Sequence, residues 1–205
     1  MIKAVLGDRL DDWVDRVVPF LLRRPINPNL LTVVGTLVSL CAAVAAGLGR
    51  FGLAGILLLG GGFFDLVDGV VARRHGSTSS FGAFLDSSLD RLVDMGILLG
   101  ILMHYAVAGE PGHVLLAGYV LVACVMVSYT KASAERLVTS FRGGVLERGE
   151  RIALIIAGLL FDLLIPALWV IAVGATITVG QRFALAYREL ERVDANARRE
   201  VGEHP

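Results

Sequence analysis

Long apolar stretches separated by short polar breaks dominate this chain of 205 residues. The breaks separate four long apolar stretches and a further apolar region with a turn near 162–166. The predicted helices cover about 30–49, 51–74, 82–107 and 114–138, and two more share 151–182. A helix that crosses the roughly 30 Å hydrocarbon core of a bilayer needs about 20 predominantly apolar residues. The pattern predicts an all-α integral membrane protein with six transmembrane helices.

The two ends of the chain have a different pattern. Residues 2–22 place apolar side chains on one helical stripe and Asp and Arg on the opposite face, which predicts an N-terminal amphipathic interfacial helix. A helix docked on the cytoplasmic side of the protein would show the same pattern. The last residues are polar and predict a flexible tail. We therefore expect a juxtamembrane helix over 1–24, a six-helix domain over 25–193 and a tail over 194–205.

Composition and charge placement agree with a membrane protein. Hydrophobic residues make up 55% of the chain and the mean hydropathy is +0.70, more than a soluble domain of this size normally carries. Lys and Arg are concentrated in the N-terminal stretch, in the region 73–91, over 131–151 and from 182 onward. If these segments face the cytoplasm, the opposite side keeps only Arg50. We expect an integral protein of the cell membrane with both termini in the cytoplasm.

Five aspartates interrupt the most apolar part of the chain. They are Asp65, Asp68, Asp86, Asp90 and Asp94. Each costs roughly 2.5–3.5 kcal/mol at the centre of a membrane helix, so their presence indicates a function. The i,i+3 spacing of the first two and the i,i+4 spacing of the last three place each set on one helix face. Two facing acidic faces suit hard divalent cations.

Depth and charge balance support a functional cluster. Arg50 precedes Asp65 by 15 residues, about 22 Å of helix, which places this carboxylate below the cytoplasmic interface in a cavity open to water. A purely structural alternative is a set of ion pairs with Arg73, Arg74 and Arg91. Three arginines cannot balance five aspartates, so we favour a cation site.

The spacing of the central residues matches a known signature. Read as a pattern, the stretch is D-x-x-D-G-x-x-A-R, eight residues, then G-x-x-x-D-x-x-x-D. Its positions are Asp65, Asp68, Gly69, Ala72, Arg73, Gly82, Asp86 and Asp90. This pattern resembles the signature of the CDP-alcohol phosphotransferase family at all eight defining positions. The resemblance covers roughly residues 25–190 and includes the Pro28-Asn29-x-Leu31-Thr32 entry to the first helix.

The resemblance implies a reaction and a set of roles. It implies a metal-dependent phosphatidyltransferase that uses CDP-diacylglycerol and releases CMP, with two Mg²⁺ ions, or Mn²⁺, and a homodimeric assembly. It assigns metal binding to Asp65, Asp68 and Asp86 and the role of catalytic base to Asp90. The implied contacts with the nucleotide and CDP-lipid are Thr32, Asp65, Asp68, Gly69, Ala72, Arg73 and Gly82. Asp94 has no assigned role; we expect a partner of Arg91 or Arg73, with direct metal ligation as the alternative.

The acceptor is indicated by a second basic set. The stretches around Lys131, Arg151 and Arg182 resemble those of the phosphatidylinositol phosphate synthase branch, in which such residues bind the phosphate of inositol 1-phosphate. Ser133 stands where that branch has Arg. Basic residues at cytoplasmic helix ends are also expected from topology alone. Two alternatives stay open: glycerol 3-phosphate as the acceptor, and a divalent-cation transporter in place of an enzyme.

Overall fold

The computed structural model describes residues 27–74, 79–137, 141 and 143–202, with only the backbone at 73, 74 and 194–202. This part of the chain forms six α-helices and no strand. They are α3 (Pro28–Gly47), α4 (Phe51–Arg74), α5 (Ser80–Val107), α6 (Pro111–Ala134), α7 (Arg148–Leu160) and α8 (Leu164–Gly202). The predicted amphipathic helix over 1–24 lies outside the described residues.

Polar residues at the breaks begin the helices. The side chain of Asn27 accepts a hydrogen bond from the N–H of Asn29 at 3.0 Å, and Pro28 occupies the first turn of α3. Ser79 accepts from the N–H of Gly82 at 2.9 Å and caps α5. Such caps satisfy backbone groups that have no partner inside the helix. The short polar breaks in the sequence are therefore the helix boundaries.

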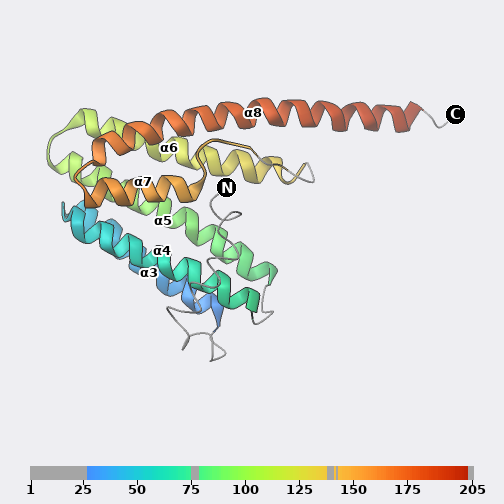
Figure 1. Ribbon diagram of the computed structural model, residues 1–205. Helices are drawn as coiled ribbons and strands as arrows, with labels where there is room; N and C mark the ends of the chain where they lie inside the picture. Colours follow the sequence, from blue (N-terminus) through green and yellow to red (C-terminus); the bar gives the residue numbers. More distant parts are fainter. Residues whose placement is uncertain (1–26, 75–78, 138–140, 142, 203–205) are drawn as a thin grey trace.

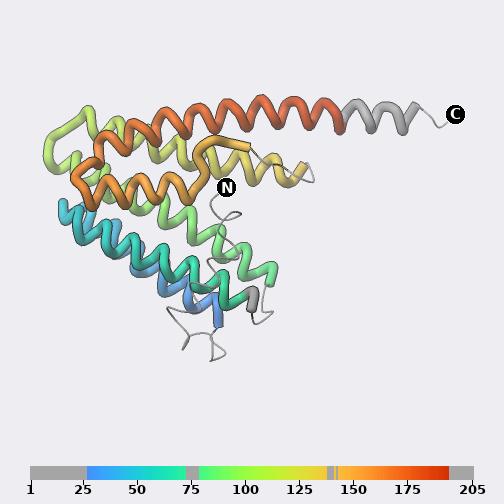
Figure 2. Tube along the Cα trace, in the orientation of Figure 1, coloured from blue at the N-terminus to red at the C-terminus, as the bar shows by residue number. Residues whose placement is uncertain are grey.

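The six helices pack side by side in a ring (Figure 1). Helix α3 packs against α4 and α5, α6 packs against α5 and α8, and α7 packs against α4 and α8. The Cα trace in Figure 2 shows that α8 runs on well beyond the bundle at its C-terminal end. The interior of the ring holds an apolar core that includes Leu58, Ile97 and Leu168, each at most 1% exposed.

Helix α8 is 39 residues long, about 58 Å, and continues to Gly202. The backbone is therefore helical through most of the range predicted as a polar tail, 194–205. The reason is local: residues 183–201 contain no glycine or proline and are rich in Ala, Arg, Glu and Leu, which favour helix. Residues 203–205 lie outside the described part of the chain.

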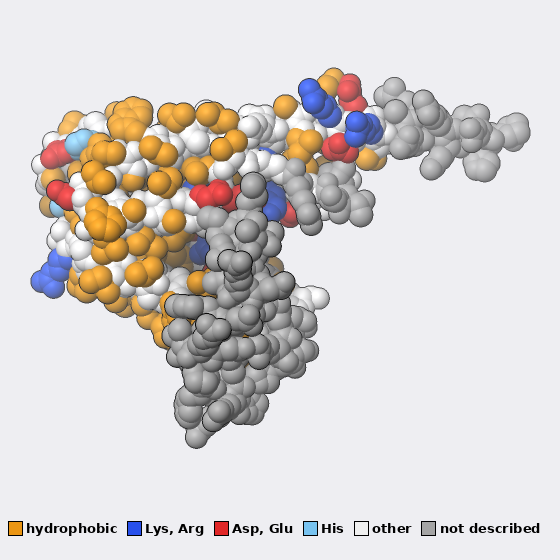
Figure 3. Space-filling view, in the orientation of Figure 1, with side chains coloured by type: hydrophobic (Ala, Val, Ile, Leu, Met, Phe, Trp, Pro, Cys, Tyr) orange, Lys and Arg blue, Asp and Glu red, His pale blue; other side chains and the backbone are white. Residues whose placement is uncertain are grey.

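The outer surface of the bundle is that of a membrane protein. Four helices are long and apolar enough to span a bilayer: α3, the Phe51–Ala72 part of α4, α6, and the Leu164–Val193 part of α8. Apolar side chains such as Leu48, Val107 and Leu115 are at least 70% exposed, and Figure 3 shows apolar groups spread over the bundle. Helix α5 is long but carries several charges, and α7 has only 13 residues, about 20 Å.

Small residues let α3 approach its neighbours closely. A Cβ atom added at Gly100 on α5 would lie 2.2 Å from the carbonyl oxygen of Ala43 on α3. A Cβ added at Gly61 on α4 would lie 2.8 Å from the carbonyl oxygen of Gly35. Helices in membranes associate largely through such close backbone packing. These contacts set the spacing between α3 and the two helices that carry the acidic residues, α4 and α5.

Candidate active site

Three carboxylates from two helices converge inside one end of the ring. Asp65 and Asp68 project from α4 and Asp86 from α5, and one oxygen of each lies within 4.8 Å of the others. Hard oxygen donors at this separation fit a divalent cation such as Mg²⁺ or Mn²⁺. The predicted pairing of the two acidic helix faces is therefore confirmed in its geometry.

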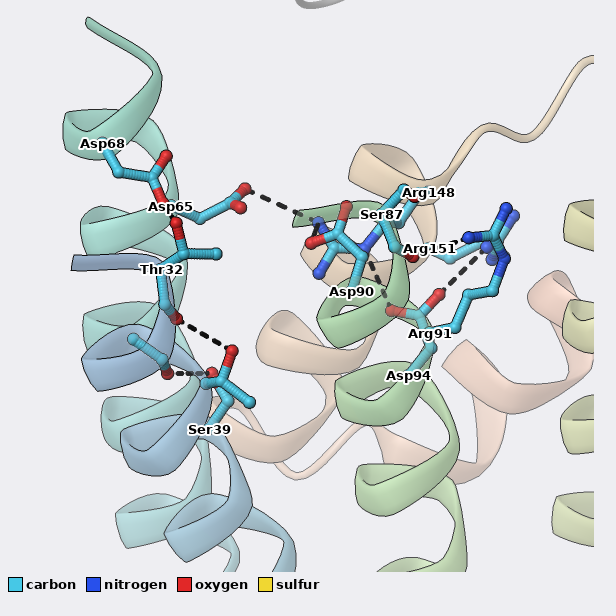
Figure 4. Close-up of polar contacts among 12 residues, drawn as sticks. Thr32, Ser39, Asp65, Asp68, Ser87, Asp90, Arg91, Asp94, Arg148 and Arg151 are labelled. Carbon is cyan, nitrogen blue, oxygen red and sulfur yellow. Dashed lines mark hydrogen bonds and ion pairs between the residues drawn. The ribbon is translucent and has the colours of Figure 1, made fainter. Parts of the chain in front are cut away.

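The most buried member of this cluster is held from α3. Asp68 is 6% exposed, and the hydroxyl of Thr32 donates to its Oδ2 at 2.5 Å. Figure 4 shows Thr32 directly beside Asp68, with Asp65 directed toward the opposite wall of the site. A hydroxyl donor at one oxygen fixes the carboxylate and leaves the other oxygen for further contacts. Thr32, which was predicted to contact the nucleotide lipid, therefore lies next to the acidic cluster.

Arg148, the first residue of α7, bridges three aspartates (Figure 4). Its Nη1 lies 2.8 Å from Oδ1 of Asp90 and 3.5 Å from Oδ2 of Asp65, and its Nε lies 3.2 Å from Oδ1 of Asp94. The guanidinium thus occupies the space between the cation cluster and the predicted base. No motif in the sequence indicated this role.

Asp94 is held by two arginines of α7. Besides Arg148, Arg151 contributes its Nη2 at 3.1 Å from Oδ2 of Asp94. The sequence predicted an arginine partner for Asp94 but named the wrong residue in Arg91, whose Nη1 donates to the carbonyl of Ser87 at 2.7 Å. The side chain of Arg73, the other named partner, lies outside the described part of the chain. Direct metal ligation by Asp94 stays an untested alternative.

Two of the three predicted acceptor-binding residues are deeply buried. Arg151 is 2% exposed and Arg182 is 4% exposed, and their charges are close enough to interact. Nε of Arg151 has no hydrogen-bond partner among the described residues. A buried guanidinium with a free donor is ready to bind an anionic group. Lys131, by contrast, is exposed and lies 3.8 Å from Glu135.

Arg182 also anchors the loop that leads into α7. Its Nε donates to the carbonyl of Gly143 at 2.9 Å, and its Nη1 donates to the carbonyl of Val127. Gly144 has φ +124°, and a Cβ there would lie 2.6 Å from Cγ2 of Thr178. Glycine is therefore required at this position for both conformation and space. The loop brings Arg148 and Arg151 to the aspartates of α4 and α5.

The small residues of the predicted signature line the neighbouring helix turns. Gly69 and Ala72 follow Asp68 on α4 and are partly exposed, and Gly82 lies in the first turn of α5. A Cβ added at Gly82 would lie 3.1 Å from Oδ1 of Asn29. Glycine at 82 therefore lets α5 begin close beside the start of α3, and Gly69 and Ala72 leave part of the α4 surface next to Asp68 exposed.

Comparison with known proteins decides the family. The model of the family described as CDP-alcohol phosphatidyltransferase matches residues 25–180. The chain belongs to this family. It is a CDP-alcohol phosphatidyltransferase, a phosphotransferase enzyme, as the eight-position motif predicted.

Several relatives of this CDP-alcohol phosphatidyltransferase carry names for inositol-linked lipids. It is 37% identical over 179 residues to archaetidylinositol phosphate synthase of Pyrococcus horikoshii, covering 87% of this chain and 93% of the relative. It is 38% identical over 218 residues to phosphatidylinositol phosphate synthase of Streptomyces avermitilis, covering 94% and 87%. These relatives support the branch that the sequence predicted.

Solved structures show the same fold. Phosphatidylinositol phosphate synthase of Mycobacterium tuberculosis with CDP-DAG bound superposes with a TM-score of 0.77 at 28% identity, over 84% of this chain and 92% of that chain. A second structure of that enzyme, in complex with manganese and citrate, has the same TM-score and identity and covers 84% and 88%. The manganese in that relative agrees with the three-carboxylate cluster described above.

Proposed function

We propose that this membrane enzyme transfers the phosphatidyl group from CDP-diacylglycerol to a phosphorylated polyol, with inositol 1-phosphate as the acceptor, releasing CMP and forming phosphatidylinositol phosphate. The observation that carries the proposal is the meeting of two opposite charge sets. Acidic side chains of α4 and α5 pair with arginines of α7, and buried Arg182 of α8 lies close enough to Arg151 for their charges to interact. A reaction between a nucleotide diphosphate and a second phosphate compound needs both sets.

Asp65, Asp68 and Asp86 are the proposed cation ligands, and Mg²⁺ is the proposed ion, with two ions bound and Mn²⁺ as the alternative. The donor set fits because all three residues offer carboxylate oxygens within 4.8 Å of one another. When bound, the cations would neutralise the diphosphate and the departing CMP. Thr32 keeps Asp68 oriented for this task through its 2.5 Å hydrogen bond.

Asp90 is the proposed general base. It lies next to the cluster without belonging to the three-residue set, and Arg148 holds its Oδ1 at 2.8 Å. In the proposed step Asp90 takes the proton of the acceptor hydroxyl. The acceptor oxygen then forms a bond to the phosphorus of the phosphatidyl group as the bond from that phosphorus to CMP breaks. The Asp90 carboxylate is therefore the proposed proton acceptor for the acceptor hydroxyl.

Lys131, Arg151 and Arg182 are the proposed phosphate-binding residues for the acceptor. The unpaired Nε of buried Arg151 supports this role most directly. Arg182 donates two hydrogen bonds to backbone carbonyls. Its main proposed contribution is therefore its positive charge and the shape that it gives to the pocket. Glycerol 3-phosphate is the second candidate because it also carries a phosphate. The names of the relatives favour the inositol compound.

The nucleotide lipid is proposed to bind on the opposite side of the cluster. Gly69, Ala72 and Gly82 are its proposed small contact residues on α4 and α5, and Arg73 is proposed to reach a phosphate. We also propose that α5 and α7 complete a set of six spanning helices, after an interfacial helix over 1–24 and before a tail over 194–205. The site is proposed to open to the cytoplasm from the cell membrane, in a homodimer.

The test is turnover by the purified protein with radiolabelled CDP-diacylglycerol and a panel of acceptors. Inositol 1-phosphate, glycerol 3-phosphate, free inositol and serine are offered in turn with Mg²⁺, with Mn²⁺ or with EDTA. We expect labelled phosphatidylinositol phosphate with the first acceptor only, and no product with EDTA. Product with free inositol or serine but not with a phosphorylated acceptor would contradict the proposed pocket. Transport of cations without any lipid product would contradict the proposed reaction and support the alternative function, a divalent-cation transporter.

A further inference from the structure

The two charge sets of the site are joined through a single ion-pair chain. It runs from Asp65 and Asp90 to Arg148, from Arg148 to Asp94, and from Asp94 to Arg151. Three helices contribute to it: α4, α5 and α7. A change at one end can therefore reach the other through three side-chain contacts.

The position of the Arg148 guanidinium sets up a competition. One nitrogen, Nη1, is shared between Oδ1 of Asp90 at 2.8 Å and Oδ2 of Asp65 at 3.5 Å. Asp65 is also one of the three residues that could hold a cation. A fixed positive charge next to a ligand carboxylate weakens the attraction of a second positive charge to the same group. Arg148 thus opposes cation binding while it orients the base.

Asp94 is what keeps this guanidinium in place. Its two oxygens bind the two arginines separately, Oδ1 to Arg148 and Oδ2 to Arg151. Asp94 is 7% exposed, and breaking one partner of such a buried network leaves a charge without compensation. The fifth aspartate therefore has a role that does not require metal ligation.

We infer that Arg148, anchored by Asp94, is a positioning residue that orients Asp90 and lowers the affinity of the three-carboxylate cluster for divalent cations. The cations then bind tightly only when a diphosphate supplies further ligands and negative charge. This inference rests on the proposed function for the identity of the base and the cluster. The part concerning cation affinity holds whichever acceptor the enzyme uses.

The test is Mn²⁺ binding to the whole purified protein, followed by the electron paramagnetic resonance signal of free Mn²⁺ in the absence of substrates. Arg148→Gln should bind Mn²⁺ about 10-fold more tightly than the wild type, because it removes the competing charge. Arg192→Gln is the matched control: it removes the same charge from an exposed part of α8 and should leave the Mn²⁺ affinity unchanged. Unchanged or weaker binding in Arg148→Gln would overturn the inference.

Two further variants separate positioning from mere structural support. Arg148→Lys keeps the charge but cannot make all three contacts, so its Mn²⁺ affinity should stay within about twofold while kcat falls at least 10-fold with little change in the KM for CDP-diacylglycerol. A wild-type kcat in that variant would contradict the positioning role. Asp94→Asn should tighten Mn²⁺ binding in the wild-type background, because it releases Arg148 from its place beside Asp65, and should have little effect on Mn²⁺ binding in Arg148→Gln. A loss of equal size in both backgrounds would show that Asp94 ligates the metal directly.

The Mn²⁺ measurements need neither the acceptor nor turnover. If no acceptor is converted but Arg148→Gln still tightens Mn²⁺ binding, the proposed function fails and the competition stands. If inositol 1-phosphate is converted normally and Mn²⁺ binding does not respond to Arg148, the proposed function stands and this inference fails.

Discussion

At the scale of single residues, Asp90 lies close to the cluster aspartates in the sequence but differs from them in the partner that its side chain binds. Arg148 binds its Oδ1, whereas Asp65, Asp68 and Asp86 form the group that could hold a metal. A carboxylate kept apart from full coordination is the one that can accept a proton. The structure therefore supports different tasks for residues that look alike in the sequence.

Asp90→Asn tests that division of tasks. Asparagine keeps the size of the side chain and an oxygen for Arg148 but cannot act as a base, so kcat should fall about 10²- to 10⁴-fold. Binding of CMP, measured by calorimetry in the presence of Mn²⁺, should change less than about threefold because the cluster is intact. Turnover within 10-fold of the wild type would reject Asp90 as the base, and loss of CMP binding would place it among the ligands.

The motif residues and the partners of Asp94 differ in how far the sequence could predict them. The acidic faces follow from i,i+3 and i,i+4 spacing, which is local and therefore readable. The bonds from Asp94 to Arg148 and Arg151 span 54 and 57 residues, and their formation depends on the path of the loop before α7. Spacing alone favoured the nearby Arg91. The choice of partner required the tertiary arrangement.

At the scale of the helices, α3 and α5 make a close backbone contact. Gly100 faces the carbonyl of Ala43, and an added Cβ would lie 2.2 Å from that oxygen, a backbone atom that cannot move without shifting α3. Gly62 on α4 has nothing within 4 Å of such an atom. The two positions offer the same substitution in a tight and in an open environment.

Gly100→Ala should therefore destabilise the bundle, while Gly62→Ala should not. Overpacking typically costs about 1–3 kcal/mol, whereas alanine in an open helical position is favourable by roughly 0.5–1 kcal/mol over glycine. Thermal unfolding in one detergent, followed by intrinsic fluorescence, should show a lower Tm for the first variant and an equal or higher Tm for the second. Equal Tm values for both variants would mean that α3 and α5 can move apart without loss of thermal stability, which would contradict this prediction.

Helix number and order were predictable because polar breaks and apolar runs are local signals. The six described helices agree with the expected order, and their ends agree to within a few residues except that α8 ends at Gly202, well beyond the expected end near Arg182. The loop 143–147 was not predictable as a structural element. It is held by contacts to α7 and α8, including the bond from the N–H of Leu146 to Oγ1 of Thr178 at 3.0 Å. Its stability comes from other helices rather than from its own sequence.

At the scale of the whole molecule, the ring has two ends of different charge. The turns between α3 and α4, α5 and α6, and α7 and α8 lie at one end, where Arg50 is the sole Lys or Arg among the described turn residues. The opposite end has Lys131, Arg136 and Arg148, and α8 extends from it with Arg188 and Arg192. Positive residues mark the cytoplasmic side of membrane proteins.

Labelling of single cysteines tests the orientation that follows from this asymmetry. With Cys41 and Cys124 replaced by alanine, one cysteine is placed at exposed Ala108, in the turn between α5 and α6, or at exposed Val193 on α8. A maleimide that cannot cross membranes should label Ala108→Cys in intact cells. It should label Val193→Cys only after the cells are permeabilised, because the basic end, and with it the opening that admits soluble acceptor, faces the cytoplasm. The reverse pattern would place the acidic cluster on the outer side, away from a cytoplasmic supply of phosphorylated acceptor, and would contradict the proposed orientation.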